Sequence, residues 1–81
     1  MSDEFADAKR KLTELVAAID PTVAVVIPER STLDAFRISL TKGPHRRFIS
    51  LSEDDMLDLI ESDAAVERTR AMLTAEIAAL A

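Results

Sequence analysis

Apolar residues near the N-terminus recur at helical spacing. They follow one another at intervals of three or four positions: Phe5, Ala8, Leu12, Leu15 and Ile19. This spacing places them on one face of an amphipathic helix, which we expect over residues 3–19. Ser2 is a suitable N-cap for this helix. Pro21 should end it, because the residue before a proline disfavours helical backbone.

The middle of the chain has the pattern of β-strands. Residues 22–27 are a β-branched apolar run, and residues 34–41 alternate between apolar and polar side chains. Residues 45–51 form a third such segment. We expect turns at residues 28–32 and 42–44, because proline, glycine and serine collect there. Connections this short favour an antiparallel meander.

Two helices are expected after the strands. Ser52 is followed by three acidic residues, a pattern typical of a capped helix start, and this helix should run over residues 53–61. Either Ser62 or Asp63 can cap a last helix over residues 64–80. A single kinked helix spanning both segments is the alternative, which we disfavour because the apolar register does not continue through the junction.

These elements predict an α+β fold in the order α-β-β-β-α-α, with a three-stranded antiparallel meander and the helices packed on one face. The chain of 81 residues is the length of one small domain, covering residues 1–81. A domain of this size buries about 60% of its unfolded surface and is therefore marginal alone. Oligomerisation is one remedy, and the chain has no Cys for disulfides.

The strand pattern also predicts which side chains face the helices. We expect these to be Phe36, Ile38, Leu40, Ile49 and Leu51. Val26 and Phe48 then lie on the outer face of the sheet. The residues around them are small or weakly polar: Ala24, Ala35 and Ser39. Such a partly apolar face is typical of a surface that a partner covers.

Charge is unevenly distributed along the chain, whose formal net charge is −5. Residues 1–47 carry eight Lys or Arg and seven Asp or Glu, whereas residues 48–81 carry two Arg and eight Asp or Glu. The net charge disfavours sequence-independent binding to nucleic acid or anionic lipid. The N-terminus has no apolar segment of the kind found in signal peptides, and no apolar run approaches the ~20 residues of a membrane span. We therefore expect a cytoplasmic protein.

The sequence offers little catalytic chemistry. His45 is the only histidine, and without Cys no nucleophile–base pair or thiolate metal site suggests itself. The single Gly excludes a glycine-rich phosphate loop. Asp54, Asp58 and Glu61 share one face of a helix, and we interpret them as a solvated acidic face. We expect no enzyme activity, no cofactor and no metal site.

One basic cluster stands out against the acidic background. It comprises residues on and beside the second predicted hairpin turn: Arg37, Lys42, His45, Arg46 and Arg47. Such a cluster can bind phosphate groups or an acidic protein.

The last helix carries little charge on either side. Ala71, Ala75 and Ala78 lie opposite its apolar stripe, and Glu76 is the only charged residue between Ala71 and Ala81. A helix of this kind is often buried on more than one side. Together with the outer sheet face, it predicts self-association.

The leading hypothesis is a non-enzymatic protein-interaction module, such as an adaptor, regulator or chaperone-like factor, that forms a homodimer and binds a protein partner. The first alternative is a nucleic-acid-contacting regulator that uses the basic residues between Lys42 and Arg47. The second is an acidic mimic of nucleic acid that inhibits a basic target through its acidic helix.

Overall fold

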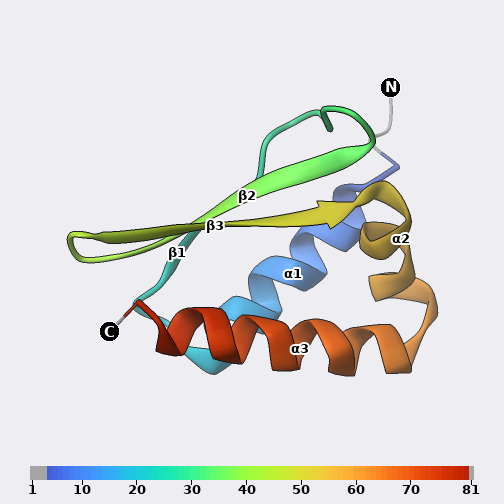
Figure 1. Ribbon diagram of the computed structural model, residues 1–81. Helices are drawn as coiled ribbons and strands as arrows, with labels where there is room; N and C mark the ends of the chain where they lie inside the picture. The colour runs from blue at the N-terminus through green and yellow to red at the C-terminus, as the bar shows by residue number, and fades with distance from the viewer. Residues whose placement is uncertain (1–3, 81) are drawn as a thin grey trace.

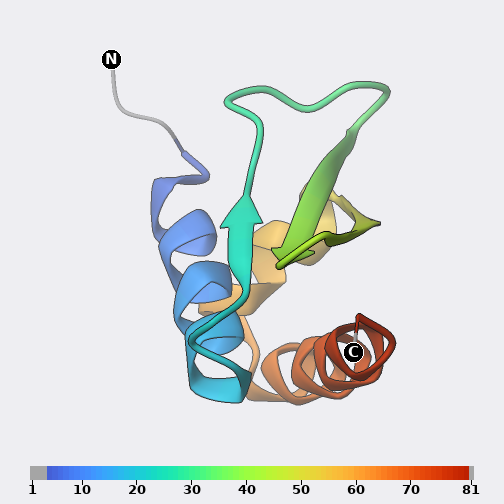
Figure 2. The same cartoon turned by 90° about the vertical axis from the view of Figure 1, so that its left-hand side faces the viewer.

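The computed structural model describes residues 4–80 and confirms the predicted element order. The elements are α1 (Ala6–Ile19), β1 (Ala24–Val26), β2 (Ala35–Lys42), β3 (His45–Ser52), α2 (Glu53–Glu61) and α3 (Asp63–Ala78). The strands form an antiparallel meander in the order β1-β2-β3. The helices lie on one side of this sheet, as Figures 1 and 2 show.

Helix α1 begins at Ala6, three residues later than the sequence predicted. The proposed cap, Ser2, lies outside the described residues. Asp7 places a carboxylate in the first turn, where the helix dipole favours negative charge. The helix ends where Pro21 predicts, because Asp20 has extended backbone with φ −155°.

Strand β1 has three residues, so the prediction of a strand over residues 22–27 was too long. The β1–β2 pairing ends at Val26. Alternate residues of β1 donate their N–H groups toward β2, and after Val26 the next such residue is Pro28, which has no N–H. At the other end, the N–H of Thr22 donates to the Asp20 carboxylate at 2.9 Å. Local sequence chemistry thus shortens a segment whose side chains all favour a strand.

The turn before β2 lies at residues 32–35, so the prediction of a turn at 28–32 was wrong in position. Thr32 and Ala35 exchange two backbone hydrogen bonds, of 2.8 and 3.1 Å. Between them, Leu33 and Asp34 have positive φ values of 51° and 62°. Two such residues closing a hairpin make a type I′ turn, and β2 therefore starts at Ala35 rather than at residue 34.

Strands β2 and β3 form a long regular hairpin. Their register runs without interruption from Lys42 opposite His45 to Ala35 opposite Ser52. The connection is Gly43, with φ +59°, followed by Pro44. A positive φ at the first turn position and the fixed negative φ of proline at the second match a type II′ turn, as a tight hairpin requires.

The two C-terminal helices are separate, which excludes the single kinked helix. Ser52 caps α2 by accepting a hydrogen bond from the Asp55 N–H at 3.0 Å. Ser62 has extended backbone, φ −137° and ψ 119°, and its side chain accepts from the Ala65 N–H at 3.2 Å. The second cap is therefore Ser62 and not Asp63. Helix α3 ends at Ala78, slightly before the predicted end.

The core lies between the sheet and the helices. All five strand residues expected to face the helices are buried: Phe36, Ile38, Leu40, Ile49 and Leu51. They meet apolar residues of the helices, of which the largest fully buried ones are Leu12, Met56, Leu73 and Val16. None of the described helices is both long and apolar enough to cross a membrane.

Candidate interaction surface

The face of the sheet opposite the helices is open in the described part of the chain (Figure 1). Its side chains alternate with the buried ones along each strand. By that alternation and the register, they are Ala24, Val26, Ala35, Arg37, Ser39, Thr41, Arg46, Phe48 and Ser50. This set contains two arginines and no acidic residue.

Two apolar side chains flank a serine in a row across the middle of this outer face. Ser39 of β2 pairs with Val26 on one side and with Phe48 on the other. The Val26 and Phe48 side chains are 62% and 50% exposed. The Arg37 guanidinium lies 4.3 Å from the centre of the Phe48 ring, within cation–π range, so it covers part of the aromatic face. The structure confirms the predicted placement of Val26 and Phe48 on the outer face.

Leu33 is a residue that the sequence analysis missed. It is 96% exposed and has left-handed backbone in the turn before β2. A bulky side chain rarely adopts that backbone, and turns of this type favour Asn or Gly. Since Leu-Asp is not a recognised turn sequence, no local signal marked this residue.

The loop that carries Leu33 rises at one end of the outer face (Figure 1). A shallow depression joins this loop to the sheet, and it is lined by Thr32, Ala35, Arg37, Phe48, Ile49 and Ser50. We use the term outer patch for Val26, Leu33, Arg37 and Phe48. Four large hydrophobic residues are exposed within residues 4–80. Three belong to this patch, and the fourth is Ile60 on α2, 47% exposed.

The basic cluster predicted from the sequence is divided between the two faces of the sheet. Lys42 Nζ lies 2.8 Å from an Asp20 carboxylate oxygen, and Arg47 Nε lies 2.7 Å from a Glu76 carboxylate oxygen on α3. Arg46 alternates with these residues and lies on the outer face with Arg37. His45, at the hairpin end, is exposed. Alternate residues of a strand face opposite sides, so the strand pattern already contained this division.

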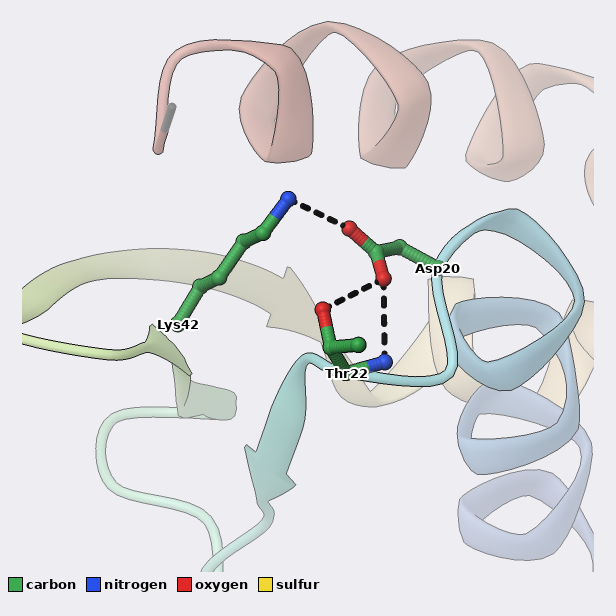
Figure 3. Close-up of polar contacts among 3 residues, drawn as sticks. All are labelled: Asp20, Thr22 and Lys42. Carbon is green, nitrogen blue, oxygen red and sulfur yellow. Dashed lines mark hydrogen bonds and ion pairs between the residues drawn. The ribbon is translucent and has the colours of Figure 1, made fainter.

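Figure 3 shows how Asp20 fastens the hairpin to the end of α1. One carboxylate oxygen accepts from Lys42, and the other accepts from the hydroxyl of Thr22 at 2.6 Å and from its N–H. The Lys42 hydrogen bond, followed by those of Thr22, lowers the Asp20 pKa from 3.8 to about 2. Lys42 therefore has a structural role that connects α1, β1 and β2.

The remaining predicted surface residues lie on the helices. Asp54 and Glu61 of α2 are exposed, and Asp58 is half-buried. Ala71, Ala75 and Ala78 of α3 are exposed, opposite the buried stripe. Binding of a basic target by the acidic residues of α2 remains a prediction. Contact of the α3 alanines with a second copy of the chain also remains a prediction.

Within residues 4–80, no group of three or more His, Asp or Glu side chains is arranged to hold a metal ion. Comparison of the chain with protein-family models, with curated proteins and with solved structures finds no match.

Proposed function

We propose that the protein is a non-enzymatic interaction module that forms a homodimer and binds a partner protein through the outer patch. The observation that carries this proposal is the concentration of exposed apolar side chains on the side of the sheet without helices. Val26 and Phe48 come from separate strands yet lie on one face. The loop that carries exposed Leu33 rises at one end of that face (Figure 1). An exposed apolar area of this kind with a polar rim is typical of protein-binding surfaces.

The charges of the outer face indicate the chemistry of the partner. Arg37 and Arg46 are the charged side chains that the strands place there. Arginine combines cation–π contact, as Arg37 makes with Phe48, with two-pronged hydrogen bonding to carboxylates. The proposed partner surface therefore presents apolar side chains flanked by Asp or Glu.

Affinity capture with matched variants tests this proposal. The tagged protein would be incubated with nuclease-treated lysate of its source cells, and bound proteins would be quantified. The double variant Val26→Ser/Phe48→Ser should lower recovery of the specific partner by at least about tenfold, since truncating interface anchors costs more than 1 kcal/mol each. Arg37→Glu should also lower it, because this change reverses the charge that complements the partner.

Ile60→Ser is the matched control. It removes an equally exposed apolar side chain from α2, away from the sheet. Recovery that depends on Val26 and Phe48 but not on Ile60 supports the outer patch. Equal recovery with the wild type and the double variant would overturn it.

The nucleic-acid alternative has less support from the geometry. Lys42 and Arg47 are paired with carboxylates on the helix side of the sheet, so they do not form one cationic surface with Arg37 and Arg46. Loss of all captured material on nuclease treatment would assign the function to nucleic acid instead.

A further inference from the structure

Within residues 4–80, strand β3 has one long side without a strand partner. The sheet order is β1-β2-β3, so β2 occupies one side of β3 and the other side is an edge. At the opposite edge, β1 has only three residues, whereas β3 has eight. An edge strand of this length presents a row of backbone donors and acceptors to another chain.

The backbone hydrogen bonds at the ends of β2 and β3 identify which backbone groups face outward. Ala35 of β2 bonds to Thr32 on the side away from β3, and Asp34 accepts from the Glu53 N–H at 2.9 Å on the side toward it. Backbone groups alternate direction along a strand. The N–H and C=O of Arg46, Phe48 and Ser50 therefore point away from β2, along the free edge.

Strand β3 lacks two structural features that commonly block an edge. It contains no proline, and its register with β2 has no bulge. Helices α2 and α3 lie below the sheet in the end-on view (Figure 2). A hollow lined by Ser50 and Leu51 of β3 and by Arg68 and Met72 of α3 lies between the β3 edge and that helix. The edge is thus geometrically suited to receive another strand.

The charges at the two ends of β3 select the strand that fits. Arg46 lies near the beginning of β3. Exposed Asp55 lies in the first turn of α2, directly after the end of β3, and lines a hollow with Ser50 of the edge. An antiparallel copy of the same segment brings the basic end of each strand beside the acidic end of the other. A parallel copy would place like charges together, which is unfavourable.

We propose that two copies of this chain pair through their β3 edges, antiparallel and about a two-fold axis near Ile49, to form one six-stranded sheet. In this register Arg46 stands opposite Ser52 of the second copy, and Asp55, which lines a hollow with Ser50 beside the edge, follows Ser52 in the first turn of α2. Phe48 lies diagonal to its counterpart, a spacing at which aromatic side chains interact. This inference rests on the homodimer in the proposed function and specifies its interface.

The mass in solution tests the pairing. Light scattering with refractive-index detection, needed because the chain has no Trp or Tyr, should give a dimer for the wild type at micromolar concentration. Ser50→Pro should give a monomer, because it replaces an outward N–H by a ring that blocks the edge without removing a bond to β2. Ser50→Ala is the matched control and should remain a dimer. Far-UV circular dichroism checks that each variant folds.

Charge exchange provides a second test that does not depend on proline. Arg46→Glu and Asp55→Lys should each raise the dimer dissociation constant by at least about tenfold, since each change places like charges beside one another. The double variant Arg46→Glu/Asp55→Lys restores opposite charges and should return the constant to near its wild-type value.

The outcomes separate this interface from the proposed function. A monomeric wild type would overturn both the homodimer and the edge pairing. Partner binding through the outer patch would still be tested separately by the capture experiment. A dimer unaffected by Ser50→Pro and by both charge reversals would overturn the edge pairing and leave a homodimer with another interface. Single reversals that weaken the dimer without restoration in the double variant would also overturn it.

Discussion

At the scale of the single residue, Leu33 carries an energetic cost without a packing benefit. Left-handed backbone costs an ordinary L-residue about 1–2 kcal/mol. The side chain is 96% exposed, so burial within the described chain does not offset that cost. Strained residues that persist are commonly found at functional surfaces. Leu33 therefore lowers the stability of the loop while contributing an apolar side chain to the proposed binding surface.

We predict that Leu33→Asn stabilises the fold and weakens partner binding. Asn tolerates left-handed backbone, so the free energy of unfolding should rise by about 0.5–1 kcal/mol. Urea denaturation measures this change. Leu33→Ala is the control, because it removes the apolar side chain but keeps the unfavourable backbone. If the Asn variant is no more stable than the Ala variant, the backbone explanation is wrong.

Asp20 predicts a loss of stability in acid. Its folded pKa is lowered from 3.8 to about 2, so its contribution is fully present above pH 3.8 and disappears as pH falls toward 2. The free energy of unfolding of Asp20→Asn should therefore vary less over this window than that of the wild type. Denaturant titrations between pH 5 and pH 2 measure the difference.

Lys42→Met tests whether Lys42 causes the lowered pKa of Asp20. Removing the largest contribution should move the Asp20 pKa upward, toward its ordinary value. Carbon-detected NMR titration of the Asp20 carboxyl reports the pKa directly. An unchanged pKa in this variant would contradict the contact shown in Figure 3.

At the scale of the element, periodicity and capping residues predicted most of the fold. Apolar spacing located α1 and α3, Pro21 located the end of α1, and Ser52 located the start of α2. These signals depend on residues close together in the sequence, so they can be recognised without knowledge of the tertiary structure.

Element boundaries failed where a partner strand or an unusual turn decided them. β1 ends at Val26 because Pro28 cannot donate to β2, a constraint that exists only once the register is known. The turn through Leu33 and Asp34 forms with residues that do not favour it, so the flanking hairpin geometry must impose it. Local propensity is overridden in such cases by pairing over a longer range.

The candidate site was predictable in part for the same reasons. Strand alternation placed Val26 and Phe48 on the outer face, as the structure confirms. The basic residues were grouped by their nearness in sequence, although the same alternation sends Lys42 and Arg47 to the helix side. Their carboxylate partners, Asp20 and Glu76, lie far away in sequence and could not be foreseen from spacing.

At the scale of the whole molecule, the outer face and the β3 edge can be used at the same time. Pairing along β3 leaves the outer face uncovered, so a dimer would present two outer patches on one continuous sheet. Such a pair can bind a partner with two matching sites more tightly than one patch can, provided that the geometry permits both contacts. A chain of 81 residues would also gain stability from the proposed association, since a core of this size is small.

This coupling between association and stability gives the last prediction. If folding and pairing are linked, the wild-type melting temperature should rise with protein concentration, because mass action favours the dimer. A protein concentration one hundred times the dissociation constant corresponds to about 2.7 kcal/mol, enough to raise the melting temperature by about 10–20 °C in a domain of this size. Circular dichroism melts over that range measure it. The Ser50→Pro variant should melt at one temperature throughout, and a concentration-independent wild type would show that each chain folds to its full stability alone.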